Sequence, residues 1–144
     1  NNYKMRTLIK KGQAEVQAKL DKLMELTDLV LLDIKHIDEE ACKRLTGQSN
    51  QHTLAFAKFL SEHNKTMWIR QGLVPHITDD EESLQRTRAF IDTLGSVEKV
   101  EVLPYHSMGE VKYEKLGIDY PLKGVQTPTK ERVMNAKRIL NEGR

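Results

Sequence analysis

Cysteine, aromatic residues and long apolar runs are all scarce in this sequence of 144 residues. Its single cysteine, Cys42, excludes an internal disulfide and agrees with a reducing cytoplasm. No apolar run is long enough to cross a bilayer, and the polar, basic start does not resemble a signal peptide. Lys and Arg total 23 against 21 Asp and Glu, so charge gives no reason to expect nucleic acid. Composition therefore predicts one cytoplasmic domain, residues 1–144, whose partners are neither nucleic acids nor membranes.

Motifs for metal and phosphate binding are missing as well. The sequence contains no CxxC or HExxH, and its five histidines are scattered along the chain. It has neither a phosphate-binding glycine loop nor the G-x-S-x-G of a serine hydrolase. No metal site can therefore be assigned from the residues present.

Residues 28–36, DLVLLDIKH, are the most informative stretch. Their branched apolar side chains predict a strand buried on both faces, as in a parallel sheet. Because side chains alternate along a strand, Leu31, Asp33 and Lys35 share one face toward its carboxyl end. Ligands of parallel α/β folds bind at that end. Asp33 and Lys35 are therefore candidate binding residues, with the alternative that they pair with each other or merely solvate the strand end.

Helical and strand patterns alternate along the chain, which implies right-handed crossovers, parallel strands and an α/β fold. Three strands are few for such a sheet, so the chain resembles part of a larger barrel or open sheet. Residues 1–12 show no clear periodicity, and residues 107–127 are expected to form a long polar connection. The expected elements are a helix over 14–27, a strand within 28–36, a helix over 38–45, a helix from Asn50 or Thr53 to about His63, a strand over 66–74, a helix from Asp79 or Asp80 to Gly95, a strand over 99–103, and a last helix starting at Thr127-Pro128 with Pro in its first position.

Polar side chains recur near the carboxyl ends of the predicted strands. Parallel order would place Asp33, Lys35, Arg70 and His106 on one rim. This set suits a small zwitterionic or anionic ligand better than a general acid/base pair. The alternatives are that Arg70 pairs with a carboxylate inside the barrel and that His106 is a structural histidine. The face directed into the barrel is expected to carry Leu29, Leu31, Trp68, Val100 and Val102.

Three groups of residues carry a family resemblance. They are Thr27 to Lys35; Trp68-Ile69-Arg70 with Leu73-Val74-Pro75 and the acidic run 79–82; and Leu103-Pro104-Tyr105-His106 with Gly109, Lys112-Tyr113, Leu116-Gly117, Tyr120 and Gly124. On these residues the chain, from about Leu20 to Leu140, resembles the pyruvate formate-lyase activating enzymes, which belong to the radical S-adenosylmethionine enzymes. Residues 1–12 do not resemble the family.

The resemblance implies the C-terminal portion of a partial (β/α)6 TIM-like barrel with parallel strands. Family members use a 4Fe-4S cluster, held by CxxxCxxC, to cleave S-adenosylmethionine reductively, and so generate the glycyl radical of pyruvate formate-lyase in anaerobic metabolism. Their electron donor is a protein such as flavodoxin or ferredoxin. By resemblance, Asp33, Lys35 and His106 lie at the S-adenosylmethionine site and Arg70 at the active-site face. Asp33, with Leu31, would also hold a monovalent cation.

Several features of the family are missing from this sequence. The cluster-binding cysteines and the glycine-rich motif for the ligand's amino group are absent, so this chain by itself is expected to be inactive. His76 stands where relatives carry glycine, so a different turn is expected there. The sequence is therefore interpreted as the C-terminal part of an activating enzyme. The alternatives are a non-catalytic truncated relative that binds a glycyl-radical enzyme, and an unrelated barrel enzyme for anionic metabolites.

Overall fold

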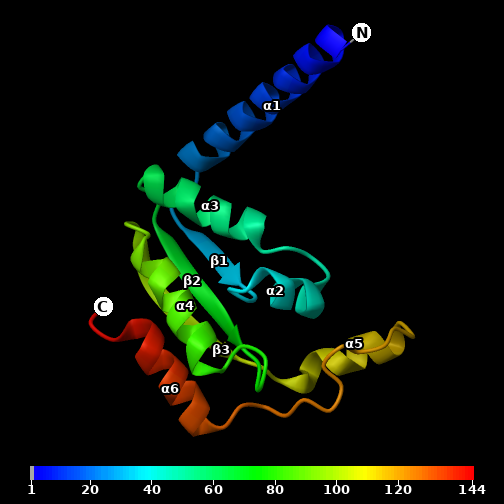
Figure 1. Ribbon diagram of the computed structural model, residues 1–144, viewed down its shortest axis with the longest axis vertical. Coiled ribbons are helices and arrows are strands. Elements are labelled where there is room, and N and C mark those ends of the chain that lie inside the picture. The colour runs from blue at the N-terminus through cyan, green and yellow to red at the C-terminus, as the bar shows by residue number, and fades with distance from the viewer. Residues whose placement is uncertain (1) are drawn as a thin grey trace.

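Three parallel strands in the order β1-β2-β3 form one open sheet in the computed structural model, which describes residues 2–144 (Figure 1). The predicted α/β fold with parallel strands is confirmed. The strands are β1 (Val30–Ile34), β2 (Met67–Leu73) and β3 (Val97–Pro104); the helices are α1 (Asn2–Glu25), α2 (Glu39–Thr46), α3 (Gln51–Glu62), α4 (Glu81–Asp92), the short 3-10 helix η1 (Ser107–Gly109), α5 (Glu110–Lys115) and α6 (Lys130–Asn141).

Side-chain caps explain where three of the helices begin. The carboxylate of Asp38 accepts a hydrogen bond from the backbone N–H of Ala41 at the start of α2, and Asp80 accepts from Ser83 at the start of α4. Thr129 is the corresponding cap of α6. Pro128 therefore precedes the cap, and the expectation that it is the first helical residue was wrong. Each cap satisfies a backbone N–H that has no partner within the helix.

Other boundaries differ from the sequence-based expectation. Residues 2–12 are helical and continue into α1, although they lack a clear apolar period. β3 is longer than the expected strand over 99–103: it begins at Val97 and ends at Pro104. Residues 110–115, expected within a polar connection, form the helix α5. A short helix with no buried residue leaves little apolar pattern to detect.

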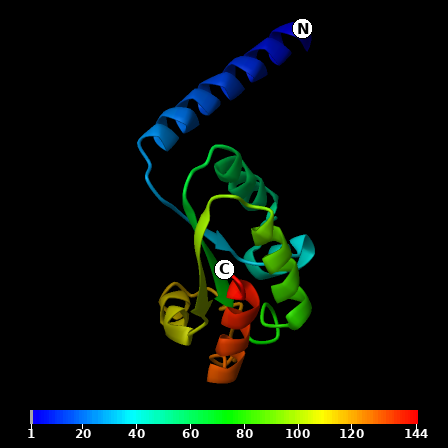
Figure 2. The same ribbon diagram turned by 90° about the vertical axis from the view of Figure 1, so that its left-hand side faces the viewer.

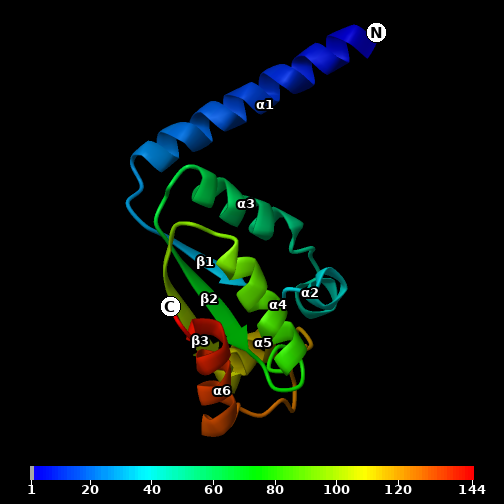
Figure 3. The same ribbon diagram turned by 60° about the vertical axis from the view of Figure 1, so that its left-hand side comes forward.

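The helices cover only one face of the sheet, so the expectation that β1 is buried on both faces was wrong. Leu32 is 5% exposed on the covered face, whereas its neighbour Leu31 is 48% exposed on the other. Val100 and Val102 were expected on the open face but are buried on the covered one. The core there includes residues of α3, α4 and α6, which lie against the sheet in Figure 3. The open face, defined by Leu31, Asp33, Trp68, Arg70, Lys99, Glu101 and Leu103, has no covering layer among the described residues.

Helix α1 projects away from this core (Figures 1 and 2). Met24 is buried in the core and Leu20 packs against it, while Val16 and Leu23 are exposed. Only the last turns of α1 therefore contribute to packing. No helix among residues 2–144 is both long and apolar enough to span a membrane.

Gln71 provides a stability test within the core, since it is 2% exposed on the central strand. Its amide nitrogen donates to the carbonyl of Gly72, but its buried Oε1 has no hydrogen-bond partner. Gln71→Met should raise the free energy of unfolding by about 1 kcal/mol, because it removes an unsatisfied buried acceptor and keeps a similar volume. Urea unfolding measures the change. Gln85→Met on exposed α4 is the control, expected within about 0.5 kcal/mol of the unsubstituted chain, and a clear loss in Gln71→Met would contradict the explanation.

Candidate functional site

Asp33 lies at the centre of a charged cluster on the open face. Strand register places Asp33 beside Arg70, and Arg70 beside Glu101, in one row across the sheet. The Asp33 carboxylate accepts a hydrogen bond from Arg70 Nε at 2.5 Å and another from Lys35 Nζ at 3.0 Å. The structure thus brings together three of the four predicted site residues, near the carboxyl ends of two adjacent strands.

These contacts are the ion pairs that the sequence analysis gave as alternatives to ligand binding. Lys35 pairs with Asp33, and Arg70 pairs with the same carboxylate. The side chains are nevertheless accessible from the open face, 58% exposed for Lys35, 32% for Arg70 and 29% for Asp33. Both cations can therefore reach a ligand on this face without unfolding of the strands.

The environment lowers the pKa of Asp33 below its ordinary value of 3.8. Partial burial raises the pKa of this carboxyl, but the hydrogen bonds and positive charges of Lys35 and Arg70 together outweigh that effect. Asp33 is thus held as a carboxylate near neutral pH. A carboxylate with two cationic neighbours suits hydroxyl donors and cations as further partners.

We expect the stabilising contribution of Asp33 to disappear in acid. Because its folded-state pKa is lowered, the contribution is present above the unfolded-state value and is lost as pH falls through the folded-state value, below 3.8. Asp33→Asn should therefore lower the free energy of unfolding at neutral pH, and the difference from the unsubstituted chain should shrink on acidification. Chemical unfolding over a pH series measures this difference. Asp21→Asn on exposed α1 is the control, and an Asp33→Asn difference that stays constant with pH would contradict the assignment.

A second pair of charges on the open face was not identified from the sequence. Lys99 donates to Glu101 at 2.6 Å and lies 4.6 Å from the ring centre of Trp68. Trp68 in turn donates from its indole N–H to Glu98 at 2.6 Å. The alternation of Lys99 and Glu101 within an expected strand was the available signal. Glu101 is thus paired with Lys99 although its register partner is Arg70.

His106 is the predicted site residue that stays apart from the cluster. It follows β3 by two residues, is exposed, and immediately precedes η1. No hydrogen bond joins its ring to Asp33, Lys35 or Arg70, all of which lie in the described part of the chain. The structure therefore places His106 at the same end of the sheet but does not test its contact with a ligand.

The turn after β2 keeps a glycine-like backbone despite its histidine. His76 has φ of +64°, in the left-handed region that favours glycine. Its backbone N–H donates to Asp79 Oδ1 at 2.7 Å, and Arg132 of α6 donates to the other carboxylate oxygen at 2.6 Å. The buried Asp79 thus holds the turn and the start of α6 together. The histidine thus adopts a backbone conformation that a glycine would adopt freely.

His76→Gly should raise the free energy of unfolding by about 1 kcal/mol. The left-handed conformation costs a residue with a Cβ about 1–2 kcal/mol, and glycine avoids this cost. The greater conformational freedom of glycine in the unfolded state offsets only part of the gain. Thermal or urea unfolding measures the change. His52→Gly in α3 is the matched control, and it should lower stability by about 1 kcal/mol because its backbone is helical. Destabilisation by both substitutions would contradict the strain at His76.

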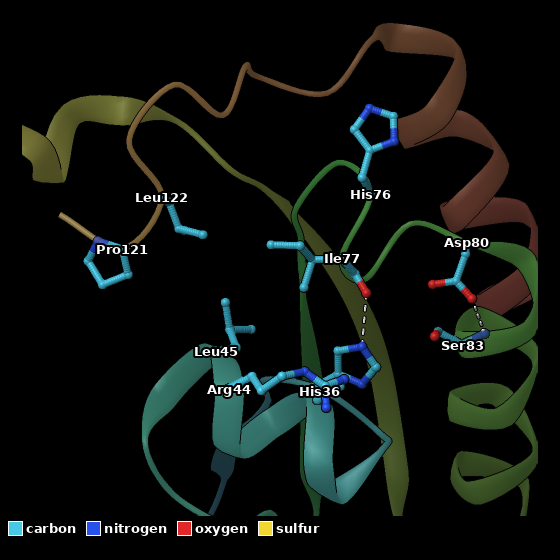
Figure 4. Close-up of a pocket in the computed structure, with 10 residues that line it drawn as sticks. His36, Arg44, Leu45, His76, Ile77, Asp80, Ser83, Pro121 and Leu122 are labelled. Atoms are coloured by element: carbon cyan, nitrogen blue, oxygen red, sulfur yellow. Dashed lines mark hydrogen bonds between the residues drawn. The ribbon is translucent and has the colours of Figure 1, made fainter.

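A cleft of about 340 Å³ lies beside this turn, between α2, the connection from β2 to α4, and residues 121–122 (Figure 4). His36, which directly follows Lys35, is buried at its base. Its Nδ1 accepts from the backbone N–H of Asp38 at 3.0 Å, so Nε2 carries the proton and donates to the carbonyl of Ile77 at 2.9 Å. This bridge ties the end of β1 to the β2–α4 connection.

Comparison with known proteins shows which proteins this chain is similar to. No family model matches the chain. The pyruvate formate-lyase-activating enzyme of Streptococcus mutans is 50% identical over 123 residues, 85% of this chain and 47% of that protein. The pyruvate formate-lyase 1-activating enzyme of Escherichia coli K12 is 44% identical over 123 residues, 85% of this chain and 50% of that protein. The chain is a homologue of the pyruvate formate-lyase-activating enzymes. It spans about half the length of the curated relatives that it matches.

The fold of this activating-enzyme homologue also matches solved structures. A crystallised domain of a pyruvate formate-lyase-activating enzyme from Bacteroides vulgatus gives a TM-score of 0.68 at 23% identity, covering 83% of this chain and 65% of that one. A radical SAM methyltransferase from Sphaerobacter thermophilus gives 0.51 at 12% identity, covering 76% and 30%. The sheet therefore matches part of a TIM-like barrel, as the resemblance implied.

Proposed function

We propose that this chain is the C-terminal part of an enzyme that activates pyruvate formate-lyase (formate acetyltransferase) by generating its glycyl radical. The observation that carries the proposal is the Asp33–Lys35–Arg70 cluster on an uncovered sheet face, in a chain 44–50% identical to activating enzymes. The single cysteine accords with a reducing cytoplasm, and the electron donor would be a small redox protein such as flavodoxin or ferredoxin.

The residues of this chain do not fit a 4Fe-4S cluster. The family's CxxxCxxC motif supplies three thiolates, whereas this sequence has one cysteine, which is buried. Among residues 2–144 no group of three or more His, Cys, Asp or Glu side chains is placed to hold a metal ion. The proposal therefore assigns cluster binding to a segment outside these residues.

S-adenosylmethionine, in contrast, fits the charged cluster. Lys35 Nζ, more than half exposed, would donate to the ligand's carboxylate together with His106. Asp33 would accept from hydroxyl or cationic groups, and with Leu31 it would hold a monovalent cation, while Arg70 would border the active-site face. When cleaved by reduction, S-adenosylmethionine is the family's source of the radical that takes a hydrogen atom from a glycine of the partner.

A chimeric enzyme tests this proposal. The half of the Streptococcus mutans relative that matches this chain is replaced by the matching 123 residues, which brings the missing segment with its cluster ligands. After anaerobic reconstitution, the chimera is given S-adenosylmethionine, a reductant and pyruvate formate-lyase. We expect the electron paramagnetic resonance signal of the glycyl radical. Folded, cluster-loaded chimera that binds pyruvate formate-lyase but yields no radical would favour the non-catalytic alternative.

A further inference from the structure

The cleft beside the β2–α4 connection is a second, separate feature of the rim. Leu45 of α2, Ile77 and Leu122 direct their side chains into the same space from three segments of the chain (Figure 4). At about 340 Å³ the cleft is at the small end of the range for ligand pockets. These three side chains offer apolar contacts to one branched aliphatic side chain within that space.

The cleft has one uncommitted charge. Arg44 lines it and makes neither an ion pair nor a hydrogen bond with any other described residue. Asp80, the acidic residue of the lining, is already engaged as the cap of α4 through the N–H of Ser83. An incoming carboxylate would therefore find a free guanidinium, to which it can bind in bidentate fashion.

The cleft is preformed and adjoins the candidate site. The His36–Ile77 hydrogen bond fixes its base, so little conformational entropy is lost on binding. Lys35 and His36 are consecutive, with Lys35 exposed and bonded to Asp33 while His36 is buried under the cleft. The cleft therefore lies next to the strand end that carries the candidate site.

We propose that this cleft docks an extended segment of the protein partner, one that presents a leucine-sized side chain next to a carboxylate. The side chain fills the space between Leu45, Ile77 and Leu122, and the carboxylate pairs with Arg44. The lining combines three aliphatic side chains with one free guanidinium, while the polar side chains of His36 and Asp80 are already engaged within the fold, which matches an aliphatic side-chain anchor next to a carboxylate. The identification of the partner as pyruvate formate-lyase rests on the proposed function. The chemistry of the occupant rests instead on the residues that line the cleft.

The test is a titration of the full, ¹⁵N-labelled chain with short peptides, in which changes in the backbone amide chemical shifts report binding. The probe is a Gly-Ser-Leu-Glu-Gly-Ser peptide with blocked ends; matched peptides carry Ser for Leu or Lys for Glu. We expect shifts centred on Arg44, Leu45, Ile77 and Leu122 for the first peptide, and binding at least about tenfold weaker for both matched peptides.

Variants of the chain complete the experiment. Arg44→Gln and Leu122→Ser should each weaken binding of the Leu-Glu peptide by roughly tenfold. Lys43→Gln on α2 and Leu116→Ser in the tail, both outside the cleft, are the matched controls and should bind as the unsubstituted chain does. Spectra of the free variants show that each is folded.

Three results would overturn the proposal: no localised shifts at millimolar peptide, equal binding of all three peptides, or tighter binding of free 4-methylvalerate, which would make the cleft a small-acid site. Because the titration needs neither cluster nor S-adenosylmethionine, it is independent of the radical assay. Peptide binding with an inactive chimera would refute the proposed function alone, and an active chimera without peptide binding would refute the docking cleft alone.

Discussion

Lys35→Ala should weaken S-adenosylmethionine binding by about ten- to a hundredfold in the chimeric enzyme, with little loss of stability. Removal of a charge-assisted hydrogen bond to a carboxylate costs about 1.5–3 kcal/mol of binding free energy. The Lys35 side chain is 58% exposed and bonded only to Asp33, so its loss from an exposed ion pair should cost less than about 1 kcal/mol of folding free energy. Lys35→Ala should thus lower the affinity for S-adenosylmethionine while it leaves the stability of the fold nearly unchanged.

Isothermal titration with S-adenosylmethionine measures the affinity, and thermal unfolding measures the stability. Lys43→Ala is the matched control, since Lys43 is also a half-exposed lysine paired with carboxylates but lies on α2. Asp33→Asn should also lower the affinity, to a degree that depends on the monovalent cation in the buffer. Unchanged affinity in both Lys35→Ala and Asp33→Asn would show that the ligand does not bind at this strand end.

Leu32→Ala should cost about 2–4 kcal/mol of unfolding free energy, whereas Leu31→Ala should cost less than about 1 kcal/mol. The two leucines are neighbours on β1, but Leu32 is 5% exposed in the core and Leu31 is 48% exposed on the open face. Truncation of Leu32 leaves a cavity under α3, while truncation of Leu31 removes atoms that already contact solvent.

Urea unfolding of the full chain measures both variants, and each serves as the control for the other. Equal losses would mean that the open face is covered in solution, by a second copy or by another segment. In the chimera, where additional barrel elements are present, we expect the cost of Leu31→Ala to rise toward that of Leu32→Ala. This change would show that the open face is the inside of the barrel.

Much of the candidate site was predictable from local rules. Strand alternation placed Asp33 and Lys35 on one face, and parallel pairing then set Arg70 beside Asp33. His106 could not be positioned in this way, because a residue in a connection follows neither the period of a strand nor its register. The cleft was also missed, since its lining comes from three segments that no single pattern links.

By itself, the sequence determined the α/β class, the order of the three strands and of the helices other than η1 and α5, and which charged residues share a strand face. These follow from periods and caps, which act between residues close together in the chain. Only the tertiary structure decided which face the helices cover, that Val100 and Val102 are core residues, and that His76 adopts a left-handed turn held by Asp79 and Arg132. A branched apolar strand is compatible with burial on either face, so burial depends on which helices pack against it.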